Sequence, residues 1–112
     1  MEESVLNTVK KMLGMNSDYT AFDTDVIICI NSALMILNQL GVCGVTSITG
    51  PNETWSEILE SKDYLESVKL YMYLKVRIAF DPPSSSFVNA SFENQIKELE
   101  WRLNVQAEQL GE

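Results

Sequence analysis

Acidic residues recur every three or four positions between residues 53 and 66, the first pattern in the chain that could support chemistry. They are Glu53, Glu57, Glu60, Asp63 and Glu66. Carboxylates at this spacing on one helix could bind Mg²⁺, but a magnesium site also needs oxygens that converge from an opposite element. The only other concentration of acids, between residues 93 and 100, lies on a segment that also carries Lys97 and Arg102. We therefore expect a solvated acidic face, with neither a metal nor another cofactor.

Nucleophilic side chains are present, but they lack the groups that would activate them. The chain has no histidine, the commonest general base near neutral pH. Ser84, Ser85 and Ser86 therefore suit a turn and a helix cap better than a nucleophile. Cys29 falls in an apolar helical stretch and is expected in the core, whereas Cys43 is expected as an unactivated loop thiol. The sequence predicts a protein that is not an enzyme.

Aromatic residues on the predicted helices are more informative about binding. Trp and Tyr are enriched at the cores of protein interfaces because they bring a large area and a polar edge. The candidate interface residues are Trp55, Tyr71, Tyr73, Phe80 and Trp101. Packing within one subunit explains each of them alone, but in so small a chain the whole set favours an oligomer. Lys75 and Arg77 lie in the same apolar stretch and are expected to reach water, with an acidic partner surface as the alternative.

Length and composition place these residues in one small globular domain. The chain has 112 residues, of which 46% are apolar and 21% are charged. We expect one domain over residues 1–112, with a flexible tail at 106–112 that orders on docking. Apolar residues at helical spacing predict an all-α bundle of four main helices, over residues 2–13, 23–40, 63–80 and 84–107. A short extra helix is expected at 54–59, where Thr54 and Glu57 have the spacing of a capping box.

The region after the second predicted helix is the least helical part of the chain. Residues 42–52 hold Gly44, Gly50 and several β-branched residues, which predict a long loop with room for a short hairpin. Because long loops in small domains are frequently functional, Val45 and Ile48 are the candidate loop contacts with a neighbouring component. The helix before the loop is apolar on two sides, so it is either central in the domain or shared with another chain.

The net charge restricts the partners. Sixteen acidic and eight basic residues give −8 at pH 7, which disfavours a protein that grips nucleic acid through its phosphates. No apolar run approaches the roughly 20 residues of a membrane span, and the N-terminus lacks the basic residues of a signal peptide. With two cysteines and no disulfide framework, the sequence predicts a soluble protein made in a reducing cytoplasm, with no membrane partner.

Several segments resemble the head–tail connector proteins of tailed bacteriophages. The most specific are residues 68–77 (VKLYMYLKVR), followed by 80–83 (FDPP) and 95–103 (QIKELEWRL). Residues 22–25 (FDTD) and 53–55 (ETW) are similar to the same family, so the resemblance covers most of the chain. Within these segments Pro82, Pro83 and Trp101 are landmarks of the family and not established contacts.

The resemblance implies a small all-α structural adaptor that assembles as a ring, commonly of about twelve copies, beneath the portal of a DNA-filled head. Its partners would be copies of itself, the portal protein and the next head-completion or tail protein. DNA would pass through its channel without sequence-specific binding. The protein would be assembled in the bacterial host cytoplasm and reside at the head–tail junction of the virion. The family offers no catalytic residues to carry over.

Charge leads to one hypothesis about this ring. An acidic channel wall lets DNA slide, whereas a basic wall would hold it, so we expect carboxylates to face the channel. A channel lined mainly by Lys75, Arg77 or Lys97 would contradict this.

Two other classes of protein remain open at this stage. An acidic helical regulator that binds a host protein or mimics DNA would use the same charge and the same aromatic residues. A fixed dimer that binds no portal would favour the regulator. An enzyme would require divalent metal binding, which calorimetry would detect.

Overall fold

The computed structural model describes residues 4–110 and confirms an all-α fold within them. The helices are α1 (Val5–Met12), α2 (Asp23–Gln39), α3 (Trp55–Ile58), α4 (Leu65–Phe80) and α5 (Ser86–Leu110), with a 3-10 turn, η1 (Lys62–Tyr64), before α4. Residues 4–110 contain no β-strand, and their extended pairing is limited to two isolated bridges, Ser4–Thr54 and Cys43–Leu59. The four main helices and the short extra helix are therefore as expected.

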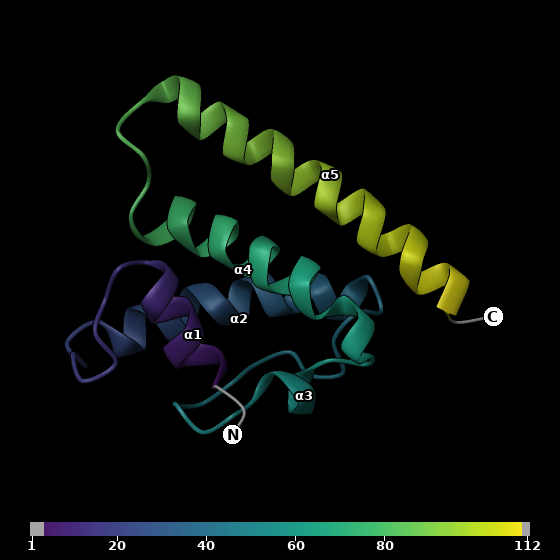
Figure 1. Cartoon of the computed structure of the whole chain (residues 1–112), viewed down its shortest axis with the longest axis horizontal. Helices are drawn as coiled ribbons and strands as arrows, with labels where there is room; N and C mark the ends of the chain where they lie inside the picture. The colour runs from purple at the N-terminus through teal and green to yellow at the C-terminus, as the bar shows by residue number, and fades with distance from the viewer. Residues whose placement is uncertain (1–3, 111–112) are drawn as a thin grey trace.

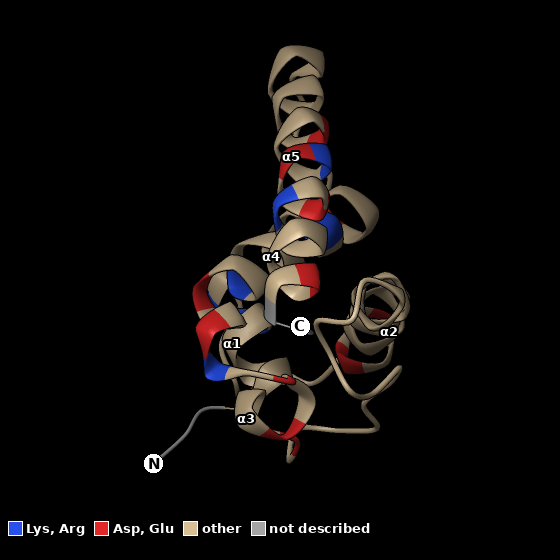
Figure 2. Ribbon diagram, turned by 90° about the vertical axis from the view of Figure 1, so that its right-hand side faces the viewer, with Lys and Arg blue, Asp and Glu red and all other residues tan. Residues whose placement is uncertain are grey.

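The helices form three layers with α4 in the middle. α1 and α2 pack against one side of α4, and α5 crosses its other side (Figure 1; Figure 2). The turn at residues 81–85 reverses the chain, so α5 starts beside the end of α4 and runs back along it (Figure 1). This path places the end of α4 and the start of α5 at one end of the molecule, which is 43 Å long.

The core is built mainly by α1, α2 and α4. The buried residues of α2, which packs against both α1 and α4, recur at helical spacing; they are Val26, Ile30, Ala33, Leu34 and Leu37. α4 adds Val68, Met72 and Val76, all without exposed surface. Among the side chains of α5 that the structure describes, only Ile96 and Leu103 are buried. Because burial of one large apolar side chain stabilises the fold by about 1.5–3 kcal/mol, most of the hydrophobic stabilisation lies outside α5.

Helix ends follow local capping chemistry. Ser4 Oγ accepts a hydrogen bond from the Asn7 amide at 3.1 Å, so α1 begins at Val5. The capping box at α3 is confirmed, because the Thr54 amide donates to Glu57 Oε1 at 3.1 Å. α2 begins at Asp23; its N-cap residue is Phe22, and no side chain caps it, so neither Asp23 nor Thr24 serves as the cap that their residue types favour.

A buried ion pair holds the start of α2, and nothing in the sequence pattern indicated it. Lys10 on α1 is 1% exposed, and its Nζ lies 2.8 Å from Asp23 Oδ1. The same ammonium donates a hydrogen bond to the Ser17 carbonyl at 3.0 Å. Lys10 therefore ties α1, the connecting segment and the first turn of α2 together.

α5 continues through residues 106–110, past the expected end of the last helix at residue 107. Ala107 lies close to the end of α2, since a Cβ built on Gly41 would be 3.7 Å from the Ala107 Cβ. Gln, Ala and Glu are good helix formers, so local preference supports this extension. Residues 111–112 lie outside the described part of the chain.

The loop at 42–52 is tied to the subunit and forms no hairpin. The Gly44 amide donates to the Ile58 carbonyl at 2.9 Å, and the Glu60 amide donates to the Val42 carbonyl at 3.0 Å. Ile48 is 2% exposed, and its backbone N–H donates to Asn31 Oδ1 at 2.7 Å. Ile48 is thus part of the core in this conformation, whereas Val45 is half-buried and keeps some free surface. No helix of the described residues has the length and apolar character needed to cross a membrane.

Candidate subunit interface

Two of the five aromatic residues predicted at an interface belong to the core of the subunit. Trp55 is 2% exposed, and its indole Nε1 donates a hydrogen bond to Thr8 Oγ1 at 3.0 Å. Tyr71 is fully buried on α4, and its hydroxyl donates to Glu100 Oε2 on α5 at 2.7 Å. Burial, with the nearby Glu100 carboxylate, raises the pKa of Tyr71. Both side chains stabilise the subunit, and neither offers surface to a partner in this conformation.

The other three predicted residues keep free surface to different degrees. Tyr73 is half-buried, with its ring 6.4 Å from that of Phe92 and its hydroxyl accepting a hydrogen bond from Arg77 Nη1 at 3.1 Å. Phe80 is also half-buried, at the end of α4. Trp101 on α5 is 67% exposed. Trp101 is therefore the predicted residue with most to gain from contact with another chain.

An aromatic cluster lies at the end of the molecule where α4 turns into α5. The Phe22 ring meets the Phe80 ring edge-on at a centroid distance of 5.5 Å, and the Tyr19 ring lies 5.7 Å from Phe22. We call Tyr19, Phe22 and Phe80 the turn-end cluster. Tyr19 and Phe22 keep 48% and 41% of their surface exposed. Beside them is a hollow of about 550 Å³, lined also by Ile28 and Cys29 of α2.

Sequence reasoning selected Phe80 of this region but missed Tyr19, Phe22 and Ile28 as surface residues. Ile28 is 61% exposed, and Met35, seven residues later, is 55% exposed. Seven residues make almost two helical turns, so the two side chains share one face of α2. That face holds none of the buried core residues of α2. Its two apolar residues, seven positions apart, are a signal that the sequence already contained.

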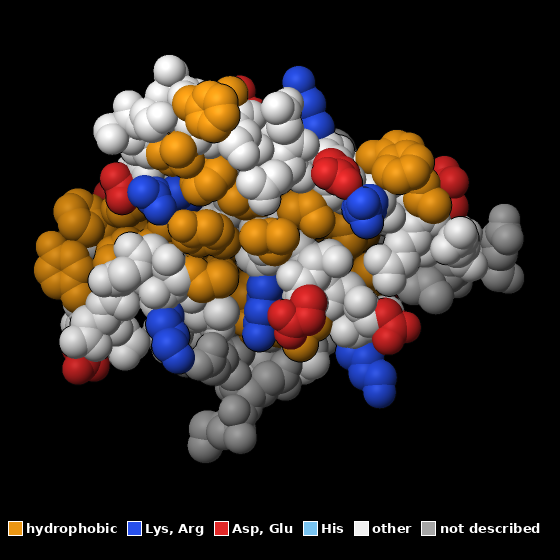
Figure 3. Space-filling model, turned by 45° about the horizontal axis from the view of Figure 1, so that its top comes forward, with side chains coloured by type: hydrophobic (Ala, Val, Ile, Leu, Met, Phe, Trp, Pro, Cys, Tyr) orange, Lys and Arg blue, Asp and Glu red, His pale blue; other side chains and the backbone are white. Residues whose placement is uncertain are grey.

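The outer face of α5 carries a second exposed apolar region. The residues that face α4 are Phe92, Ile96, Leu99 and Leu103, which are buried or half-buried. Phe87, which sequence reasoning did not select, is 84% exposed, and Trp101 follows it by nearly four turns on the same face. Figure 3 shows hydrophobic side chains spread across this side of the molecule between groups of charged side chains.

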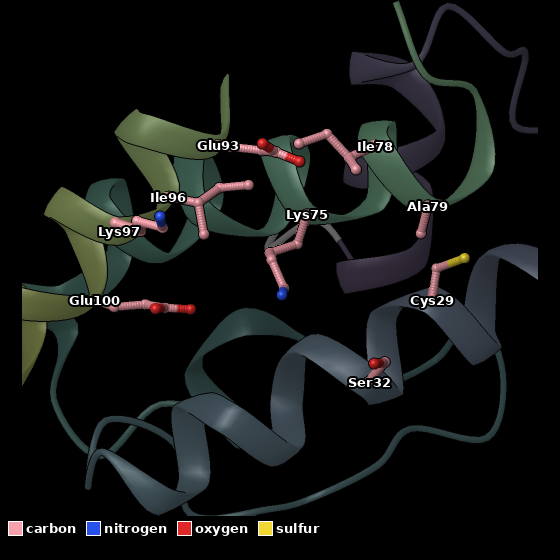
Figure 4. A pocket seen from close by; sticks show the side chains of 9 residues that line it. All are labelled: Cys29, Ser32, Lys75, Ile78, Ala79, Glu93, Ile96, Lys97 and Glu100. Atoms are coloured by element: carbon pink, nitrogen blue, oxygen red, sulfur yellow. The ribbon is translucent and has the colours of Figure 1, made fainter. Parts of the chain in front are cut away.

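A groove of about 530 Å³ lies between α2, α4 and α5. Figure 4 shows Lys75 pointing from α4 into the space above α2, with Lys97 and Glu100 on the α5 wall. Cys29 lies on the α2 side; it is half-buried and packs against the edge of the core that it was expected to join. Cys29 and Ala79 also line the hollow at the turn-end cluster, so the groove and the hollow are continuous.

The described cysteines are not activated nucleophiles. Burial, assisted by Glu60, raises the pKa of Cys43 to about 12. Burial and the nearby Asp25 also raise the pKa of Cys29. Both thiols therefore stay protonated at neutral pH. Within residues 4–110 no cluster of three or more His, Cys, Asp or Glu side chains could hold a metal ion.

The acidic residues between 53 and 66 form a solvated surface around α3 and η1. Glu57, Glu60, Asp63 and Glu66 are exposed, and Lys62 is the only base among them. Glu53 instead holds the loop, because its Oε2 accepts from the Thr49 amide at 2.9 Å, which lowers the pKa of Glu53. Figure 2 shows carboxylates around α3 at the end of the molecule away from α5.

Comparison with known proteins identifies one family. A family model described as phage connector protein matches residues 5–110, which is nearly the whole chain. No curated protein and no solved structure matches the chain significantly.

Proposed function

The chain belongs to the phage connector protein family, and we propose that it is a structural virion protein that assembles as a ring beneath the portal. The match over residues 5–110, which takes in every helix, carries the proposal. The ring would contain about twelve copies, extend the DNA channel and provide the docking platform for the next head-completion or tail protein. This role places the protein at the head–tail junction and requires no catalysis.

The distribution of exposed apolar side chains supports a ring. One group lies at the turn-end cluster, and another lies on the outer face of α5 at Trp101. A ring is built from heterologous contacts, in which each subunit presents two different surfaces to its two neighbours. Two separate apolar surfaces on one small subunit meet that requirement.

The acidic surface around α3 and η1 supports a channel that does not hold DNA. We propose that the exposed carboxylates Glu57, Glu60 and Asp63 face the channel. Like charge repels the DNA backbone, so the DNA slides past without binding in a defined register. Arg77 donates from Nε to the Asp81 carbonyl at 2.6 Å, so its side chain is engaged within the subunit, and Lys75 points into the groove between the helices.

The native mass over a concentration series tests the proposal directly. Light scattering after size exclusion should show a closed species of about 150 kDa, the mass expected for about twelve 12.6 kDa chains. Negative-stain images of that peak should show rings with a central hole. Where the isolated chain stays monomeric, the same measurement after incubation with a purified portal ring should show the rings bound to it.

Other native masses would indicate a function different from the connector role. A dimer at every concentration that does not bind the portal would favour the acidic regulator over the connector role. A chain that neither forms rings alone nor binds the portal ring would overturn the proposed function.

A further inference from the structure

We infer that neighbouring copies of this chain meet head to tail, with Trp101 of one subunit entering the hollow beside the turn-end cluster of the next. This inference rests on the proposed ring and names the two surfaces that form it. The occupant of the hollow is thus a second copy of the same chain.

The two surfaces lie well apart on the subunit. The hollow is lined by Phe22 and Phe80, at the end where α4 turns into α5. α5 begins at that end and runs back along α4, so Trp101 lies about 22 Å from its start at 1.5 Å per residue. In Figure 1 this direction follows the long axis of the molecule. A contact between the two surfaces therefore joins different ends of neighbouring subunits.

The area needed for a stable contact favours this arrangement over a two-fold dimer. A stable interface buries about 800 Å² on each partner. A two-fold contact of Trp101 with its own copy would leave Phe22 and Ile28 exposed. A head-to-tail contact covers both Trp101 and the hollow, and it repeats at every subunit.

The hollow suits an indole in size and chemistry. Its volume of about 550 Å³ lies within the range of pockets that bury whole ligands. Phe22, Ile28 and Phe80 provide apolar and aromatic walls. Aromatic rings gain from edge-to-face contact beyond the area that they bury, and this wall already contains such a pair.

Charges beside the two surfaces are complementary. Asp25 is exposed, lines the hollow and has no ion pair among the described residues. Lys97 lies one turn before Trp101, is exposed and likewise has no ion pair among the described residues. Arg102, the other base near Trp101, already forms an ion pair with Glu98, with 2.7 Å between Nη2 and Oε1. Lys97 of one copy is therefore the base left to meet Asp25 of the next.

A charge-exchange experiment tests this pairing. Lys97→Glu and Asp25→Lys should each raise the concentration for half-assembly about tenfold, because each places like charges together at every contact. The double variant restores opposite charges and should return to within about threefold of the native chain. Lys69→Glu, a change of the same charge on α4, is the matched control and should leave assembly unchanged.

A second measurement reports on the hollow itself. Trp101→Ala should raise the concentration for half-assembly by about tenfold or more, whereas Leu70→Ala, at an apolar residue with 44% exposure, should not. Cys29 lines the hollow and Cys43 is 2% exposed, so maleimide should label Cys29 first. Assembly should slow that labelling, and Lys97→Glu should restore its rate; Cys29→Ser identifies the labelled thiol.

The outcomes separate this inference from the proposed function. Rings that form normally from Lys97→Glu and from Trp101→Ala would overturn the inference and leave the connector role intact. A double charge variant no better than the single ones, or Cys29 labelling that is unaffected by assembly, would also overturn it. A native chain that forms no ring, alone or on the portal, would overturn both.

Discussion

α2 and α5 are the two longest helices of the described chain, both pack on α4, and they have opposite roles. α2 packs against α1 and α4 and buries five apolar residues at helical spacing, whereas Ile28 and Met35 are exposed to solvent. Of the described side chains of α5, only Ile96 and Leu103 are buried, and Phe87 and Trp101 are exposed. The difference shows how so small a subunit can both fold and assemble. One helix supplies the core, and the other keeps an apolar face for a partner.

The largest effect is expected in the centre of α2. Leu37 has no exposed surface, so Leu37→Ala should lower the free energy of unfolding by about 2–5 kcal/mol. Chemical denaturation of the unassembled chain measures this change. Met35→Ala on the same helix, at a side chain with 55% exposure, is the control and should change stability by less than about 0.5 kcal/mol. Equal effects of the two substitutions would remove the distinction between the faces of α2.

The next effect concerns the pair that holds the start of α2. Lys10→Ala removes the cation from Asp23 and the donor from the Ser17 carbonyl. We expect a loss of about 2 kcal/mol, because Asp23 is partly exposed and water can replace some of the interaction. Lys11→Ala, at the adjacent exposed position, should cost much less. Thermal unfolding of the two variants side by side would show whether Lys10 is structural.

A smaller effect is expected where α5 joins α4. Tyr71→Phe removes the hydrogen bond to Glu100 and should cost about 1 kcal/mol, with faster amide exchange in α5 than in α2. Exchange that rises equally in both helices would show that α5 and the core open together.

The same residue gives a pH dependence. The pKa of Tyr71 is raised in the folded state, so the fold favours the neutral phenol. That contribution is complete below the unfolded value of 10.0 and is lost as the pH rises above it. Stability of the native chain should therefore fall above pH 10 relative to Tyr71→Phe. Parallel curves for the two proteins across that range would argue against a buried phenol.

The smallest effect on stability is expected on the outer face of α5. Trp101→Ala should change the unfolding free energy of the unassembled subunit by less than about 0.5 kcal/mol, because the indole is 67% exposed. Denaturation below the assembly concentration isolates this quantity from any effect on the ring. A loss of about 2 kcal/mol or more would mean that Trp101 supports the fold and would weaken the contrast with α2.

The helices and their ends were largely predictable from the sequence, because they depend on residues within one or two helical turns of each other. The 3.6-residue spacing of apolar side chains predicts α2 and α4, and Thr54 with Glu57 predicts the start of α3. Asp81 and the two prolines after it end α4 as expected. The end of α5 was placed too early, because the apolar periodicity fades after Leu103 and the packing of Ala107 near Gly41 lies outside any local pattern.

The candidate interface was predictable only in part. Of the interface candidates selected by aromatic composition, Phe80 and Trp101 keep free surface, whereas Trp55 and Tyr71 are buried. It missed Phe22, whose contact with Phe80 joins residues far apart in the chain. Lys10 was missed for the same reason, since its partners lie beyond the helix that carries it.

The two tryptophans separate what the sequence determined from what the tertiary structure decided. Helical periodicity, capping and the family resemblance are contained in the order of residues, and they were sufficient for an all-α connector subunit. Whether each indole is buried or exposed could not be read from that order. Trp55 is buried because Thr8, 47 residues away, supplies a hydrogen-bond acceptor. Trp101 is exposed because α5 packs on α4 along one side, and no helix of the described residues covers its opposite side (Figure 1). Burial depends on the element that lies opposite, and that is decided only when the whole chain packs.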